Sequence, residues 1–125
     1  MDRTLTFLSI GVVFWVVAAI FMHYVGPLVF DGGVQHAVFW LLNFLLPVAV
    51  LPLIARFTDR TRHQMLAPTC LIVLPAMTLD GIAISLDTLG LTHAYANTPW
   101  LAGVTGGFLL FAFASFLFWA IVWQE

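Results

Sequence analysis

Residues 66–88 read LAPTCLIVLPAMTLDGIAISLDT, and this stretch decides the fold. As a helix rising ~1.5 Å per residue it is about 35 Å long, enough to cross the ~30 Å hydrocarbon core of a bilayer. An aspartate at the centre of such a helix costs about 2.5 to 3.5 kcal/mol, whereas each Leu, Ile, Val or Phe contributes only about 0.3 to 0.6. This span is therefore marginal on its own. We predict that it is the most enclosed helix of a bundle, with Asp80 turned inward.

Three further stretches have the same length and apolar character, so the predicted spans are residues 5–25, 34–55, 66–88 and 99–123. Of the 125 residues, 62% are hydrophobic and 8% are charged, against about 25% charged residues in a soluble domain. Short turns rich in glycine, proline and polar residues connect the spans and leave no room for a soluble domain. The sequence predicts one all-α domain over residues 1–125, an integral membrane four-helix bundle running up-down-up-down.

The composition excludes several classes of function. Four Lys and Arg in total cannot form the basic patch that nucleic-acid binding requires. The single cysteine, Cys70, excludes an internal disulfide, a CxxC redox pair and a cysteine zinc site. No P-loop, GxSxG or HExxH motif is present. His23, His36 and His93 fall on one predicted side of the membrane but form no i, i+4 pair, so we predict neither a metal nor a cofactor.

The arginines predict the orientation, because cytoplasmic segments retain Lys and Arg. Arg3 precedes the first span, and the other three surround the second turn, at Arg56, Arg60 and Arg62. We therefore expect both termini to be cytoplasmic, in a multi-pass protein of the inner (cytoplasmic) membrane. A cleaved signal peptide is the alternative for the first span, but its apolar run exceeds the ~7 to 15 residues of such a segment, which favours an uncleaved anchor.

One helical face of the third span holds a stripe of residues at separations of 4, 3, 4 and 7, which includes both aspartates: Thr69, Val73, Ala76, Asp80 and Asp87. Pro75 removes a backbone donor about one turn below Asp80 and predicts a kink. Two interpretations stay open. The bent helix presents a carboxyl group to a cavity, or a buried, protonated Asp80 forms a hydrogen bond to a neighbouring helix and sets its register.

The second span offers partners for this carboxyl group. His36 and Asn43 are seven residues apart, and their expected depths bracket that of Asp80, so the three side chains are predicted to meet. Asp87 is level with His36 and suggests an ion pair, and Trp15 is close in depth to Asn43 and suggests a hydrogen bond to its carbonyl. For Asn43 a bond between helices is favoured over contact with a ligand. These five residues are the candidates for a ligand or ion site.

The fourth span combines small residues with phenylalanines. Gly103 and Gly107 form a small-xxx-small step that permits close approach of another helix. We predict Gly103, Gly107 and Pro75 as helix-packing residues. Whether the fourth span packs within the protomer or forms an interface with another chain is left open by the sequence.

The C-terminal half resembles a bacterial family of small four-span membrane proteins known as a domain of unknown function. The residues that carry the resemblance are Leu74, Pro75, Ala76, Met77, Thr78, Leu79 and Asp80, followed by Asn97, Thr98 and Pro99. The outer loop departs from the family pattern through its longer polar run, residues 92–98. The resemblance implies a four-helix fold and a recurring intramembrane aspartate, and it implies no activity.

Three classes of function remain. The sequence favours an accessory or assembly subunit of a larger membrane complex, because the turns are short and catalytic motifs are lacking. The alternative is a small oligomeric channel or proton-coupled transporter that uses Asp80. A membrane-embedded enzyme or cofactor carrier is the least favoured class. The expected partners are the lipid bilayer and either other membrane subunits or further copies of this chain.

Overall fold

The computed structural model describes residues 3–124. Its elements are α1 (Arg3–Tyr24), α2 (Gly26–Val29), α3 (Val34–Phe57), η1 (Arg62–Gln64), α4 (Leu66–Thr88) and α5 (Pro99–Val122). Within this range every regular element is helical, and α1, α3, α4 and α5 are long and apolar enough to cross a membrane. The predicted all-α fold with four spans is confirmed. The third span has its predicted bounds, and the other three differ by one or two residues at their ends.

Local chemistry explains where α4 ends and α5 begins. Gly90 follows the last turn of α4 with a φ of 74°, a left-handed conformation that glycine adopts without strain and that reverses the chain. Thr98 caps α5, because its side-chain oxygen accepts a hydrogen bond of 3.2 Å from the Leu101 amide. Pro99 follows in the first turn, where no backbone donor is needed.

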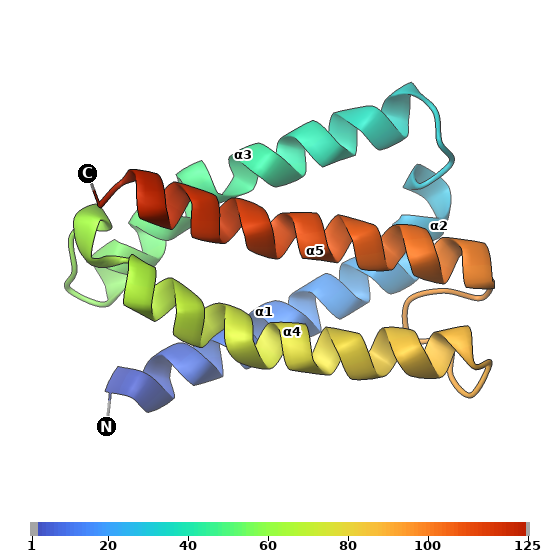
Figure 1. Cartoon of the computed structure of the whole chain (residues 1–125), viewed down its shortest axis with the longest axis horizontal. Helices are drawn as coiled ribbons and strands as arrows, with labels where there is room; N and C mark the ends of the chain where they lie inside the picture. The colour runs from blue at the N-terminus through green and yellow to red at the C-terminus, as the bar shows by residue number, and fades with distance from the viewer. Residues whose placement is uncertain (1–2, 125) are drawn as a thin grey trace.

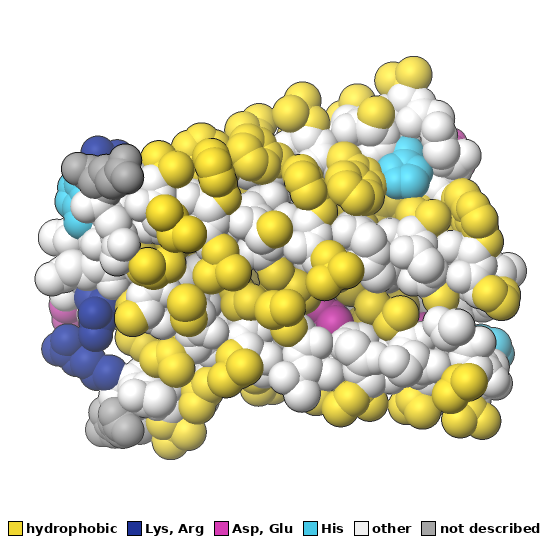
Figure 2. Space-filling model, viewed as in Figure 1, with side chains coloured by type: hydrophobic (Ala, Val, Ile, Leu, Met, Phe, Trp, Pro, Cys, Tyr) yellow, Lys and Arg dark blue, Asp and Glu magenta, His cyan; other side chains and the backbone are white. Residues whose placement is uncertain are grey.

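The order of the helices places α4 and α5 at the centre. α4 packs against α1 on one side and α5 on the other, and α3 packs chiefly against α5. The two ends of the described chain lie at the same end of the bundle, with η1, whereas α2 and the loop before α5 lie at the opposite end (Figure 1). The Lys and Arg atoms visible in Figure 2 all gather at the first of these ends. We call these the arginine end and the loop end.

The buried apolar side chains form two clusters. One includes Tyr95 of the loop that precedes α5, and its largest other members are Met22, Phe30, Leu101, Phe108 and Leu109. The other includes Phe7, Leu51, Met65, Ile72 and Ala120. Eight residues of α4 are buried, against seven in α5, five in α3 and three in α1. This confirms that the third span is the most enclosed.

The glycine with the tightest surroundings, Gly11, lies where α1 packs against α4. A Cβ atom at Gly11 would stand 2.1 Å from the carbonyl oxygen of Ile72 and 2.6 Å from Cγ of Pro75. Pro75 therefore packs against another helix, as predicted, and α4 continues through this proline. A Cβ atom at Gly103 or Gly107 would meet nothing within 4 Å, so among the described residues this small-xxx-small step makes no close helix contact. Gly103 is exposed and Gly107 half-buried, and packing against another chain stays a prediction.

Candidate functional site

Asp87 organises the loop of residues 89–98. Its Oδ1 atom accepts hydrogen bonds from the Thr92 hydroxyl (2.6 Å) and the Ala94 amide (2.9 Å). Its Oδ2 atom accepts from the amides of Tyr95 (2.7 Å) and Ala96 (3.1 Å). Four donors to one carboxylate explain how a charged group that is only 5% exposed is tolerated. The loop is consequently folded back onto the bundle instead of extending into solvent.

The folded loop delivers Tyr95 into the helix bundle. Tyr95 is 1% exposed, and its hydroxyl donates a hydrogen bond to Oδ1 of Asp80, fifteen residues earlier in α4. Burial, followed by the hydrogen bond to Asp80, raises the pKa of Tyr95 far above its ordinary value. The phenol therefore keeps its proton and acts as the donor. Asp80 itself is 3% exposed, which confirms that this aspartate is turned inward.

The second oxygen of Asp80 differs from the first. Within residues 3–124, Oδ2 is buried and accepts no hydrogen bond. Trp15 of α1 is near enough to interact with both Asp80 and Tyr95, yet its buried N–H makes no hydrogen bond of normal geometry. Asp80 and Asp87 thus differ sharply, because the carboxylate of Asp87 accepts four hydrogen bonds and the carboxyl group of Asp80 accepts one. A buried polar atom without a partner costs free energy, which makes Asp80 the unusual group of the pair.

His23 attaches the loop to α1. Its Nδ1 atom lies 3.1 Å from the carbonyl oxygen of His93 and 2.9 Å from that of Ala94. Since both partners are carbonyl oxygens, Nδ1 carries the proton and donates. Among the described residues, no group of three or more His, Cys, Asp or Glu is placed to hold a metal ion. The two hydrogen bonds of His23 instead hold the loop in place above Asp80.

A cavity of about 250 Å³ lies between α4 and α5, and Asp80 is its only charged lining residue. The other residues that line it are Met77, Gly81, Ile84, Ser85, Gly106, Leu109, Leu110 and Phe113. Figure 2 shows acidic atoms between these two helices on a face that is otherwise largely apolar. The cavity thus joins one carboxyl group to an apolar surface.

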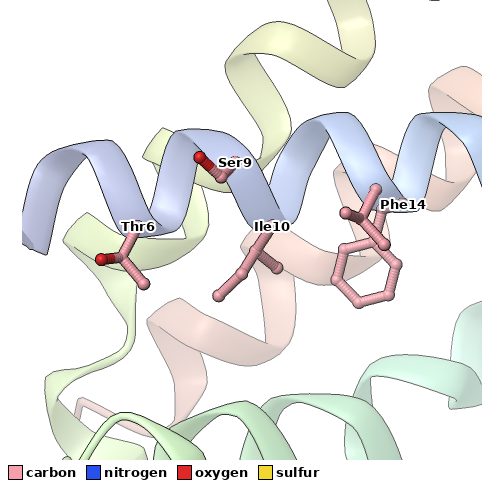
Figure 3. A pocket seen from close by; sticks show the side chains of 5 residues that line it. Thr6, Ser9, Ile10 and Phe14 are labelled. Atoms are coloured by element: carbon pink, nitrogen blue, oxygen red, sulfur yellow. The ribbon is translucent and has the colours of Figure 1, made fainter.

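A second hollow, of about 260 Å³, lies beside α1 (Figure 3). Its lining comes from one helix, at Thr6, Ser9, Ile10, Val13 and Phe14. The Ser9 hydroxyl donates to the carbonyl oxygen of Leu5 at 2.8 Å, as serine commonly does within a helix. No charged group lines this hollow, so it lacks the chemistry found at Asp80.

The structure does not bring His36 and Asn43 to Asp80. The Asn43 amide donates a bond of 3.0 Å to the carbonyl oxygen of Phe108, and thus joins α3 to α5. Nδ1 of His36 accepts a bond of 3.1 Å from the Gly32 amide in the turn that precedes α3. The predicted meeting of these side chains is wrong because α5 separates α3 from α4. The role of Asn43 as a bond between helices is confirmed.

The other two predicted contacts are also replaced. Asp87 binds the loop instead of His36, since both its oxygens accept bonds from residues 92–96. Trp15 lies by Asp80 and Tyr95 instead of donating to Asn43. Sequence reasoning missed Tyr95 altogether. The available signal was a single aromatic residue between two alanines, in a loop that follows an acidic residue at the end of a helix.

Comparison with protein families, with curated proteins and with solved structures finds no match to this chain. The resemblance carried by residues 74–80 and 97–99 therefore stays a prediction.

Proposed function

We propose that this chain is a small proton-coupled membrane transporter or channel in which Asp80 takes up and releases the proton. The observation that carries the proposal is the contrast between the two buried aspartates. Asp87 has the four hydrogen bonds expected of a structural carboxylate. Asp80 has one, from Tyr95, its second oxygen is buried without a hydrogen bond among the described residues, and its side chain lines a cavity. A group whose task is to hold helices together gains from having both oxygens satisfied.

The surroundings of Asp80 suit a group that changes its protonation state. With one hydrogen bond in an apolar site, the neutral acid is favoured, since an isolated carboxylate in a low-dielectric medium is costly. Ionisation requires either water or a cation at the unpaired oxygen. The cavity between α4 and α5 supplies the space for this. Ionisable residues inside a membrane commonly mark such proton and ion pathways.

The loop supplies a gate at the loop end. Tyr95 covers Asp80 as long as Asp87 and His23 hold the loop in place. Release of the loop removes Tyr95 from Asp80 and opens a route between the carboxyl group and the water at this end. We place the arginine end at the cytoplasm of a cell with an inner membrane, in keeping with the retention of arginine on the cytoplasmic side. The gate then faces outward.

Proton flux into liposomes tests the proposal. Purified protein is reconstituted with an internal pH-sensitive dye, and the initial flux is recorded after an imposed pH step. We expect Asp80→Asn to reduce the flux to that of empty liposomes while the protein stays folded, because the amide accepts the Tyr95 hydrogen bond but cannot carry a proton. The matched control is Asp31→Asn, an exposed acid whose Oδ1 accepts one bond from Gly33 at the loop end. Undiminished flux in Asp80→Asn contradicts the proposal.

An accessory or assembly subunit is the second candidate, and a specific observation favours it. On α5, a Cβ atom at Gly103 or Gly107 would meet nothing within 4 Å among the described residues, and Leu110 near them is 63% exposed. Such a surface suits close packing of a helix from another membrane protein. Purification from native membranes in a mild detergent checks this candidate. A stoichiometric partner protein supports it, and recovery of this chain alone counts against it.

A further inference from the structure

The cavity between α4 and α5 has the composition of a binding site for a small organic cation. We propose that it binds a small lipophilic ammonium ion, a protonated alkyl or arylalkyl amine, with the ammonium group against the carboxyl group of Asp80. This inference rests on the proposed function, because it names the substrate class of the same site. Its volume of about 250 Å³ lies below the ~300 to 1,000 Å³ typical of sites for drug-sized ligands, so the ligand is small.

The charge of the ligand follows from Asp80. This side chain is 3% exposed and lines the cavity, and its Oδ2 atom has no partner. An anion would be repelled, and a neutral hydrocarbon would leave the oxygen unpaired. A hard metal cation requires six or more oxygen ligands, which the cavity does not offer. An ammonium group donates a hydrogen bond to Oδ2 and compensates the charge of the carboxylate.

The rest of the cavity suits the apolar part of such a cation. Leu109, Leu110 and Phe113 of α5 and Ile84 of α4 line it. Burial of hydrocarbon against these side chains contributes about 25 cal/mol per Å². An aromatic ring such as Phe113 also attracts an adjacent cation through its π face.

A polar contact is available at the edge of the site. The Ser85 hydroxyl lines the cavity and donates to the carbonyl oxygen of Gly81 at 2.7 Å. Its own oxygen can still accept a bond from a second ammonium hydrogen. The cavity thus offers a hydroxyl oxygen in addition to the carboxyl group.

The cavity opens toward the side of the bundle. Gly81 and Ser85 are exposed, and a Cβ atom at Gly81 would meet nothing within 4 Å. In a membrane this opening faces the acyl chains. A lipophilic amine concentrates in the bilayer and therefore reaches Asp80 laterally.

Exchange of the cation for a proton follows from the charge balance. When the ammonium ion binds, Asp80 loses its proton to water, so one proton leaves for each cation bound. The other titratable groups on elements packed against α4 lie elsewhere or hold the loop, and α5 contains none. They are Arg3, His23 and Tyr24 of α1, Arg62 and His63 of η1, Cys70 and Asp87 of α4, and His93 and Tyr95 of the loop. Only Tyr95 has a hydrogen bond to Asp80.

Binding of 2-phenylethylamine to the purified protein in nanodiscs, measured by isothermal titration calorimetry, tests the inference. While Asp80 is protonated and the amine is charged, we expect the Kd to fall about tenfold for each unit by which the pH rises, because binding releases one proton. The neutral alcohol 3-phenyl-1-propanol should bind at least tenfold more weakly. Equal binding of the alcohol and the amine, or no amine binding between pH 6 and pH 9, overturns the inference.

Two variants and one control locate the ligand. Asp80→Asn should weaken binding at least tenfold and remove its pH dependence. Gly81→Leu should also weaken binding at least tenfold by filling the opening, and it leaves the carboxyl group in place if Asp80→Asn does not fold. Gly103→Leu is the matched control, since Gly103 lies on a helix surface without contacts and outside the cavity. Unchanged affinity in both Asp80→Asn and Gly81→Leu overturns the inference.

The two proposals fail separately. Proton flux that depends on Asp80, together with the absence of amine binding, refutes the ammonium site and leaves the proposed function intact. Amine binding that depends on Asp80 and releases one proton, without proton flux into liposomes, supports the site and refutes proton-coupled transport. Amine binding without proton release contradicts the inference.

Discussion

Replacing Asp87 by asparagine removes one of the two oxygens that hold the loop of residues 89–98. Each oxygen of Asp87 accepts two hydrogen bonds, at distances between 2.6 and 3.1 Å. Asparagine keeps one acceptor oxygen and places an NH₂ group against the two remaining donors. Two charge-assisted hydrogen bonds are therefore lost, each contributing about 1.5 to 3 kcal/mol. We take the lower value for both, about 3 kcal/mol in total.

A loss of about 3 kcal/mol raises the equilibrium population of the open loop about a hundredfold. Hydrogen exchange read by mass spectrometry on a peptide that covers residues 89–98 measures this change. The amides of Ala94, Tyr95 and Ala96 should exchange about a hundredfold faster in Asp87→Asn than in the original chain. Asp31→Asn is the control, and it should leave these amides unchanged. Exchange within threefold of the original chain in Asp87→Asn would refute the assignment of Asp87 as the residue that holds the loop.

Three further substitutions test separate contacts. Gly11→Ala should destabilise the protein by about 1 to 3 kcal/mol, because the new Cβ atom overlaps the backbone of α4. Gly103→Ala is the control and should not destabilise the protein, because the space around Gly103 is open. Equal unfolding curves of the two variants in SDS would contradict the close contact at Gly11. Asn43→Ala should lower the free energy of unfolding by about 0.6 kcal/mol, and by at most about 1.7, because the hydrogen bond to the carbonyl oxygen of Phe108 is lost. Unfolding curves of the variant and the original chain measure this difference. Because the pKa of Tyr95 is raised in the folded protein, the contribution of its neutral phenol to stability is complete below the unfolded pKa of about 10 and declines as pH rises above that value. From pH 9 to pH 11, Tyr95→Phe should therefore lose less stability than the original chain, as unfolding curves at the two pH values check.

The local pattern predicted the helices and the inward face of α4 well. Leu66–Thr88 has its predicted bounds, and Thr69, Val73 and Ala76 are buried together with Asp80. Both results follow from properties of a single segment. The length of an apolar run determines whether it spans a bilayer, and the cost of a charge in lipid determines which face of the helix turns inward.

The partners of Asp80 were predicted poorly. Depth along each helix wrongly brought Trp15 to Asn43, and His36 and Asn43 to Asp80, because depth carries no information on which helices are neighbours. Tyr95 escaped prediction because it lies in a loop, where no helical period applies, and only the hydrogen bonds to Asp87 show that the loop folds inward.

Hydropathy and the positions of charged residues thus specify the number of spans and the enclosed face of α4. The order α1, α4, α5, α3 and the close approach at Gly11 emerge only when the helices are assembled. Lipid tails are as apolar as leucine, so hydrophobicity does not choose between neighbouring helices in a membrane. That choice depends on the fit of side chains and on hydrogen bonds between distant segments, such as the bond from Tyr95 to Asp80.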